Sequence, residues 1–264
     1  MFGLSDLAAG GSGALVGFTL GLIGGGGSVL AVPLLVYAVG VASPHVAIGT
    51  SSVAVAINAL VNLVGHARQG NVRWPCAAVF STAGVLGASL GSTAGKAFDG
   101  QKLLALFGVV MIVIGIVTLL RKPMRDEDFT PLGRKNAKSM GPRLVAMGGA
   151  VGAMSGFFGI GGGFLIVPGL MASAHMPMLK AVGTSLVAVA LFGMTTAVSY
   201  AASGLVDWRI VGIFIAAGAI GGVLGTKAAV RLAAQKAALT RVFAGIVICV
   251  GLYVVVRGVL ALMR

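Results

Sequence analysis

Long apolar stretches separated by short polar gaps set the pattern of this chain. About 20 consecutive apolar residues are enough to cross a bilayer as a helix, so several membrane-spanning helices are expected. Helices are predicted near residues 45–65, 75–95, 103–120, 179–200, 209–229 and 242–262, and two further apolar segments, 8–42 and 144–174, are interrupted by glycines. This pattern predicts an all-α polytopic membrane protein with about eight to ten helices.

The two halves of the chain resemble each other. Residues 17–33 align with 152–168 at an offset of 135 residues. Three further matches share an offset of 134, namely 47–51 with 181–185, 70–74 with 204–208, and 101–102 with 235–236. Four matches in the same order predict a duplicated unit, which is common in transporter folds. The expected organisation is a first membrane repeat at 1–120, a cytoplasmic basic linker at 121–143 and a second membrane repeat at 144–264.

The amino-acid composition is that of a membrane protein, and it changes how the positive net charge is interpreted. Hydrophobic residues make up 58% of the 264 residues and charged residues only 9%, against roughly a quarter charged in a soluble domain. The net charge of +13 arises from Lys and Arg in the gaps between apolar runs. Such basic gaps indicate cytoplasmic loops and contact with anionic lipid rather than nucleic-acid binding.

The relation between the repeats depends on how each glycine-broken segment crosses the membrane. If it crosses once, the repeats are parallel; if it returns as a hairpin of two helices, they are inverted. With the linker in the cytoplasm, 12 of the 19 basic residues lie inside for parallel repeats and 14 for inverted ones. The length of the broken segments also suits a hairpin. The pattern therefore favours inverted repeats and leaves parallel ones open.

The paired glycine breaks are the first candidate for a substrate site. Unwound backbone at membrane depth occurs where it is buried in protein or lines a cavity. A helix that restarts after a break has free N–H groups and a positive dipole end, which suit an anion. The alternative is that the glycines only let helices pack closely. The candidate substrate-binding residues are Gly24, Gly25, Gly26, Gly27 and Ser28 in the first repeat and Gly159, Gly161, Gly162 and Gly163 in the second.

Polar side chains inside the predicted helices are the second group of candidates. Thr50 and Ser51 match Thr184 and Ser185, and these hydroxyls could donate to substrate oxygens or bond a carbonyl one turn back. Asn58 and Asn62 lie one turn apart on one helix, and an amide in hydrocarbon needs partners. Their counterparts are Phe192 and Thr196, so a site that includes the amides is asymmetric.

Two further glycine pairs have the four-residue spacing that is typical of close contacts between membrane helices. They are Gly87 with Gly91 and Gly221 with Gly225.

Other chemistries find little support in the sequence. No cofactor, metal or catalytic site is predicted, because no His, Cys or acidic cluster has ligand or nucleophile spacing. The carboxylates all fall at termini or in loops, so no intramembrane proton or sodium relay is expected. His45, His66 and His175 fall at the ends of predicted spans and are expected to be solvated or interfacial. The two cysteines are expected to be buried small side chains.

The duplicated glycine-rich segment, the Gly-Thr-Ser motifs at Gly49 and Gly183, and the turns that end at Trp74 and Trp208 resemble the sulfite exporter TauE/SafE family, also called the toluene-sulfonate uptake permeases. The resemblance covers nearly the whole chain except the linker. It implies a multi-pass carrier in the bacterial inner membrane that moves sulfite, an organosulfonate or a related small anion. One departure is Arg73, which stands where the second repeat has Asp207.

We therefore expect a non-enzymatic secondary transporter that works by alternating access. The alternatives are a carrier of another small organic anion such as a carboxylate, or an anion channel; an embedded enzyme and a purely structural subunit are disfavoured. Without an intramembrane carboxylate, the driving force is either the membrane potential or a proton carried on the substrate. The expected partners are the small anionic substrate and membrane lipids, with no nucleic acid, and the sequence leaves a homo-oligomer open.

Overall fold

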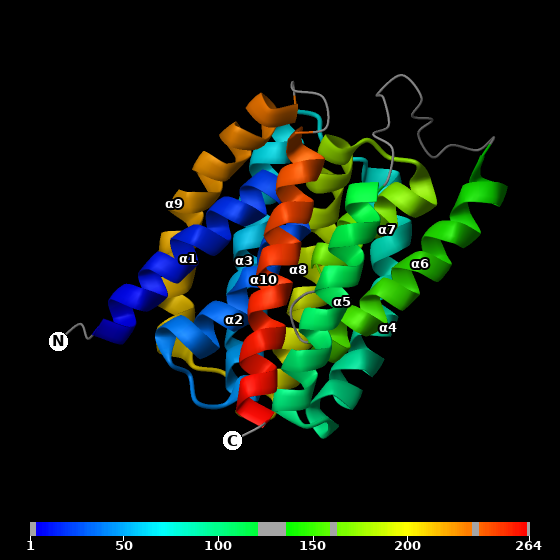
Figure 1. Ribbon diagram of the computed structural model, residues 1–264. Coiled ribbons are helices and arrows are strands. Elements are labelled where there is room, and N and C mark those ends of the chain that lie inside the picture. Colours follow the sequence, from blue (N-terminus) through cyan, green and yellow to red (C-terminus); the bar gives the residue numbers. More distant parts are fainter. Residues whose placement is uncertain (1–3, 121–135, 159–162, 234–237, 263–264) are drawn as a thin grey trace.

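The computed structural model describes residues 4–120, 136–158, 163–233 and 238–262, and every regular element in these ranges is a helix (Figure 1). The first repeat contains α1 (Leu4–Ile23), η1 (Gly24–Leu30), α2 (Ala31–Leu34), η2 (Leu35–Val39), α3 (Pro44–Arg68), α4 (Trp74–Ala97) and α5 (Gly100–Leu120). The second contains α6 (Ala137–Phe158), α7 (Gly163–Ala174), α8 (Met178–Ala201), α9 (Trp208–Ala233) and α10 (Ala238–Leu262). Within the described residues, 7 helical stretches are long and apolar enough to cross a membrane. The predicted class, an all-α polytopic membrane protein, is confirmed.

The helix boundaries lie close to those predicted, with one clear difference. α6 begins at Ala137, inside the segment 121–143 that the sequence indicated as a linker. Lys138 and Arg143 are exposed on its first turns, so this helix starts with polar residues before its apolar part. Hydropathy alone does not separate a polar helix end from a loop, because both are rich in charge. The remainder of the linker, 121–135, lies outside the described residues.

Three helices begin where the sequence supplies a capping side chain. Ser43 accepts a hydrogen bond from the backbone N–H of Val46 at 3.5 Å, and Pro44 follows at the first helical position of α3. Asp99 accepts from the N–H groups of Gln101 and Lys102 before α5, at 3.1 and 2.9 Å. Asp207 accepts from Arg209 and Ile210 at 3.0 and 3.1 Å and so caps α9. These bonds satisfy N–H groups that have no partner inside the helix.

Replacing Asp207 with alanine is expected to lower the free energy of unfolding by about 1 kcal/mol, because the first turn of α9 loses its cap. Arg73 occupies the same place before α4 and makes no side-chain cap hydrogen bond there, so the two helices begin differently. Thermal unfolding of the detergent-solubilised protein measures the change. Asp207→Asn is the control, since asparagine caps as well as aspartate does. Equal losses for Ala and Asn would contradict the capping role.

Two tight helix pairs repeat the same contact on opposite flanks of the molecule. α1 packs along α9, and α6 packs along α4 (Figure 1). Gly17 of α1 lies against the backbone of Gly218, and Gly152 of α6 lies against the backbone of Gly84. In lipid such small residues let backbones touch, which is what holds helices together there. The predicted contacts are confirmed: the pair Gly87 and Gly91 faces α6, and the pair Gly221 and Gly225 faces α1.

Helices that correspond in the two repeats run in opposite directions. Along α5 and α10, Gly108 lies beside Gly251, and Gly115 lies beside Ile248 and Ala244. Position numbers rise along one helix as they fall along the other, so the pair is antiparallel. α3 and α8 show the same relation, because Gly193 lies beside Ala56 while Gly49 lies beside Tyr200, farther along α8. This is the relation that inverted repeats have.

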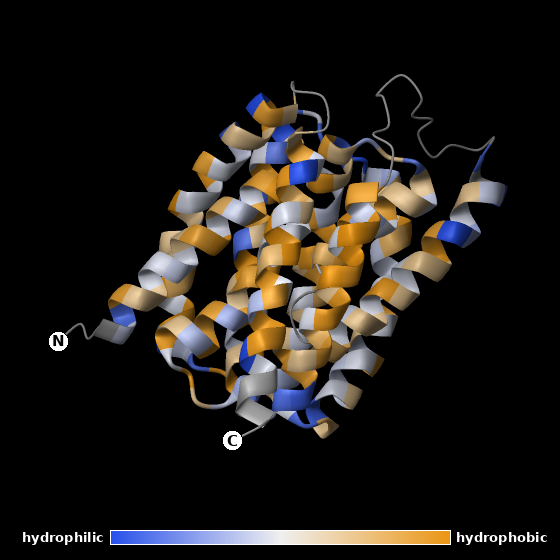
Figure 2. Ribbon diagram, in the orientation of Figure 1, coloured by the Kyte–Doolittle hydropathy of each residue, from blue (hydrophilic) through white to orange (hydrophobic). Residues whose placement is uncertain are grey.

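The surface of the helix bundle is apolar. Figure 2 shows hydrophobic residues along the lengths of the helices, with hydrophilic residues gathered mainly near their ends. Leu86, Leu90 and Ile220 are each at least 70% exposed. In contrast, Ser28, Thr50, Asn58 and several other polar side chains are fully buried. An apolar exterior around a polar interior is what a bilayer requires, since lipid offers no hydrogen-bond partner.

Candidate functional site

The two glycine-broken segments meet at the centre of the molecule. Gly24 to Ser28, which form most of η1, are all buried. A Cβ built on Gly25 would lie 2.6 Å from both the Cα and the carbonyl oxygen of Gly163, the first residue of α7. The two backbones therefore touch, and the junction joins one repeat to the other. Close packing is one real role of these glycines.

Local sequence explains why the first segment breaks there. Gly24 has φ +64°, a left-handed conformation that glycine adopts without a steric penalty. Gly27 folds back onto α1, where its carbonyl accepts a hydrogen bond from the Thr19 hydroxyl at 3.3 Å. Farther on, Pro33 provides no N–H for a regular helix. The chain therefore leaves α1, makes a 3₁₀ segment and turns back instead of continuing the helix.

Two side chains from the second repeat enclose the broken segment. Ser185 of α8 accepts a hydrogen bond from the Gly25 N–H at 3.0 Å and donates to the Val182 carbonyl at 2.7 Å. The fully buried ring of Phe243 from α10 lies against Gly26, so closely that a Cβ there would overlap it. We call this set the central junction: residues 24–28 together with Gly163, Ser185 and Phe243. It lies at the interface between repeats, where transporter substrate sites are commonly built.

The central junction includes a helix amino terminus. α7 begins at Gly163, and the first N–H groups of a helix lack partners within it. The dipole of this 12-residue helix makes the same end positive. Of the second-repeat glycines predicted to bind substrate, only Gly163 can be placed; Gly159, Gly161 and Gly162 lie outside the described residues. Substrate binding by any of these glycines stays a prediction.

The two Gly-Thr-Ser motifs hold the loops of the opposite repeat. Thr50 accepts a hydrogen bond from the Asp207 N–H at 2.9 Å, and Thr184 accepts one from the Arg73 N–H at 3.0 Å. Gly49 and Gly183 beside them give the same loops room to approach. The matching bonds show a structural reason for the motif that the sequence did not suggest. Of the serines, Ser51 bonds the Ile48 carbonyl at 2.9 Å, the alternative weighed from the sequence.

Asn58 and Asn62 pack against α9 rather than within the central junction. Asn58 donates to the Phe214 carbonyl at 3.4 Å and lies on Gly218. The Asn62 amide oxygen accepts from the Thr226 hydroxyl at 3.3 Å, and its Nδ2 donates to the Asn58 carbonyl. Each amide therefore has a partner for its Nδ2, as hydrocarbon surroundings demand, but the buried Oδ1 of Asn58 has no hydrogen-bond partner among the described residues. Their proposed contact with substrate remains untested.

His66 was expected at a solvated or interfacial position, and this expectation is wrong. The side chain is fully buried, and its Nε2 lies 2.8 Å from the Gly21 carbonyl, three residues before the break. Because a carbonyl only accepts, Nε2 carries the proton, and Nδ1 faces the Asn71 amide at 3.4 Å. The internal alignment pairs His66 with Tyr200, whose side chain is also fully buried in the structure.

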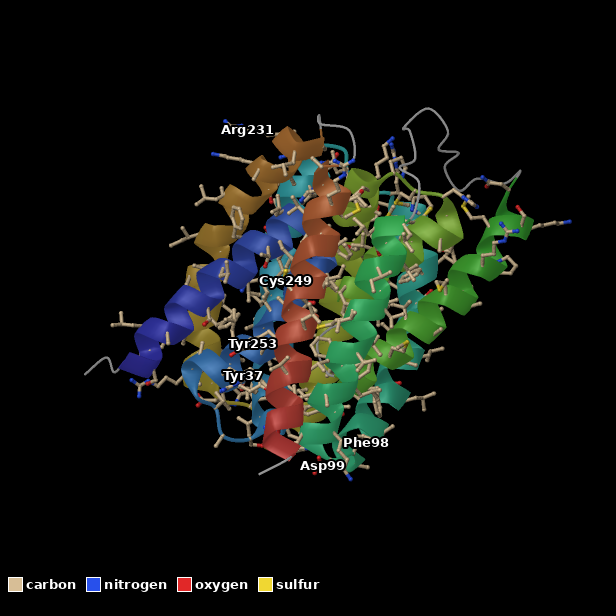
Figure 3. All side chains as sticks on the ribbon, viewed as in Figure 1. Tyr37, Phe98, Asp99, Arg231, Cys249 and Tyr253 are labelled. Carbon is tan, nitrogen blue, oxygen red and sulfur yellow. The ribbon has the colours of Figure 1, made fainter. Side chains whose placement is uncertain are left out.

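The expectation that both cysteines are buried is wrong for one of them. Cys76 is buried as expected, but Cys249 is exposed on α10, where it lines an apolar cavity of about 270 Å³. Tyr37 and Tyr253 line the same cavity, and their rings meet edge to face with centroids 5.5 Å apart (Figure 3). Asp6 lies in the first turn of α1, where its carboxylate pairs with Arg209 at 2.6 Å. Position along an apolar run did not reveal which face of a helix packs inward.

The described residues contain no group of three or more His, Cys, Asp or Glu side chains that could hold a metal ion. The remaining features are apolar spans, antiparallel contacts between helices that the internal sequence alignment pairs, and a buried break after α1 that meets the start of α7. These are features of a class, the multi-pass membrane transporters.

The chain belongs to the sulfite exporter TauE/SafE family, which it matches over residues 9–254. It is 51% identical over 251 residues to a "Probable membrane transporter protein" of Xylella fastidiosa, covering 94% of each chain. It is 28% identical over 267 residues to the "Probable membrane transporter protein YunE" of Bacillus subtilis, covering 94% of this chain and 96% of that protein. No solved structure matches the chain.

Proposed function

We propose that this protein is a secondary transporter that carries a small anion, sulfite or an organosulfonate, across the bacterial inner membrane by alternating access. The observation that carries the proposal is the meeting of the two broken segments at Gly25 and Gly163. Family membership supports transport across a membrane, and the family's name supports sulfite as the substrate.

The central junction has the chemistry that a small oxyanion needs. Backbone N–H groups at the start of α7 provide hydrogen-bond donors, and the positive end of the helix dipole attracts negative charge. No charged side chain is needed to bind an anion in such a place. The Gly25 N–H already donates to Ser185, so an arriving anion would compete for this bond.

The arrangement of the repeats suits alternating access. Two glycine-packed pairs, α1 with α9 and α4 with α6, flank the junction, and each pair combines one helix from each repeat. Inverted repeats can exchange conformations, so that the site opens to one side and then to the other. In the present structure the first broken segment is buried, which corresponds to a closed state of the site.

Uptake of radiolabelled sulfite into proteoliposomes that contain the purified protein tests the proposal. We expect saturable uptake that unlabelled sulfonates compete, because the same N–H groups would bind either oxyanion. Counterflow, in which internal unlabelled sulfite accelerates uptake of the label, distinguishes a carrier from an anion channel. Protein-free liposomes are the control. Flux of small carboxylates without flux of sulfite would discard the substrate and keep the transporter.

A further inference from the structure

A groove of about 310 Å³ lies between α3 and α9, close to the carboxy-terminal ends of both helices. Its lining includes the cationic residues Arg68 and Lys227 and the polar residues Asn62 and Thr226. The two cations come from different repeats and are both exposed. The groove contains no carboxylate among the described residues that line it, so their charge is not neutralised within it.

The polar side chains give the groove a hydrogen-bonding floor. Asn62 is 2% exposed and Thr226 is 5% exposed, and the Thr226 hydroxyl donates to the Asn62 amide oxygen at 3.3 Å. This bond fixes the two side chains relative to each other. Above this floor, a guanidinium and an ammonium supply several N–H donors, which match the oxygens of a phosphate group.

The walls of the groove are those of a lipid-facing surface. Val64 and Val223 line it and are 49% and 52% exposed, and Leu224, beside Val223 in the chain, is 58% exposed. A free inorganic anion would gain nothing from these side chains, whereas an acyl chain would cover them. The combination of cations, polar floor and apolar walls matches a phospholipid, whose phosphate and acyl chains are joined.

The position of the groove agrees with this ligand. It lies at the end of the molecule where α9 finishes, near Arg231, which is one turn beyond Lys227 (Figure 3). α5 ends and α6 begins at the same end (Figure 1). Arg231 and the exposed Lys138 and Arg143 on the first turns of α6 are basic residues of this end, which predicts that it is cytoplasmic. Basic pockets between helices on that side bind acidic headgroups.

We infer that the groove between α3 and α9 binds the phosphate headgroup of an anionic phospholipid, held by Arg68 and Lys227. This site is separate from the central junction, and it stands whether or not the transported anion is sulfite. The bound lipid would connect helices of the two repeats at one membrane face, because α3 belongs to the first and α9 to the second.

Native mass spectrometry of the delipidated protein in detergent, titrated with phosphatidylglycerol, tests the inference. We expect saturable binding to the unmodified protein and binding about thirtyfold weaker to the double variant Arg68→Gln/Lys227→Gln. The control Lys138→Gln/Arg143→Gln removes two exposed charges from the first turns of α6, near the same end of the bundle, and should bind as the unmodified protein does. Arg68→Lys/Lys227→Arg should retain binding.

Three results would overturn the inference. Equal weakening by both double variants would show that net charge alone attracts the lipid. Phosphatidylcholine binding as tightly as phosphatidylglycerol would remove the role of the cations. Displacement of the lipid by inorganic phosphate or sulfite at similar concentrations would make the groove a site for free anions. If the double glutamine variant does not fold, Lys227→Gln alone, at an exposed position, should still weaken binding about fivefold.

Discussion

Gly163→Ala is expected to abolish both the folded state and transport. The added Cβ would overlap the carbonyl oxygen, carbonyl carbon and Cα of Gly25, and backbone atoms in a buried junction cannot move aside as a flexible side chain can. Overpacking of this kind costs about 3 kcal/mol or more, a large part of the stability of a typical protein. Detergent size-exclusion chromatography and thermal unfolding measure the folded fraction, and sulfite uptake measures function.

Gly245→Ala is the matched control for this experiment. Gly245 is a helical glycine of α10, it is exposed, and a Cβ there would meet nothing within 4 Å. Alanine is the better helix former, so this variant should be as stable as the unmodified protein or more so. Normal folding and normal uptake by Gly163→Ala would contradict the close contact between the broken segments. Loss of uptake with unchanged stability would indicate that Gly163 serves the substrate rather than packing.

The second large effect concerns Gly26 and Phe243. Gly26→Ala should destabilise the protein by about 1–3 kcal/mol, because the new Cβ overlaps the Phe243 ring. Here the obstacle is a side chain, so a second change can remove it. In the double variant Gly26→Ala/Phe243→Leu, leucine is smaller than phenylalanine and leaves room for the new Cβ. Much of the lost stability should therefore return. We expect a favourable coupling of about 1–2 kcal/mol between the two changes.

Thermal unfolding of the four proteins in this cycle measures the coupling, with sulfite uptake as a second readout. Phe243→Leu alone should lose stability because it leaves a gap in the junction. Strict additivity of the two single changes would contradict the contact between Gly26 and Phe243. If stability returns in the double variant and uptake does not, Gly26 contributes conformational freedom or an N–H position that alanine does not reproduce. Return of both stability and uptake would show that Gly26 is required only because a larger side chain does not fit beside Phe243.

The duplication shows how far sequence comparison reaches in this protein. The offset between the halves predicts that α3 corresponds to α8 and α5 to α10, and apolar length located the spans. Spacing of small residues also identified real helix contacts, such as those of Gly87 and Gly91 with α6. These features depend on residues close together in the chain, or on a copy of the same segment, so the sequence contains them.

The same reasoning could not distinguish between roles that identical residue types play. Thr50 and Thr184 were candidates for substrate binding, and the structure shows each of them accepting an N–H from a loop of the other repeat. Asn62 was also a candidate for substrate binding, and the structure shows its amide oxygen accepting a hydrogen bond from Thr226 of α9. For each of these three bonds the partner lies more than 100 residues away in the chain.

The sequence by itself determined that this chain is an all-α membrane protein with several spans. Apolar length and residue spacing are enough for that conclusion, because a bilayer permits few other structures. Only the tertiary structure decided that Gly25 touches Gly163, that His66 is buried against Gly21, and that Arg68 and Lys227 share one groove. Each of these contacts joins distant parts of the chain, and the packing of helices, rather than any local preference, brings them together.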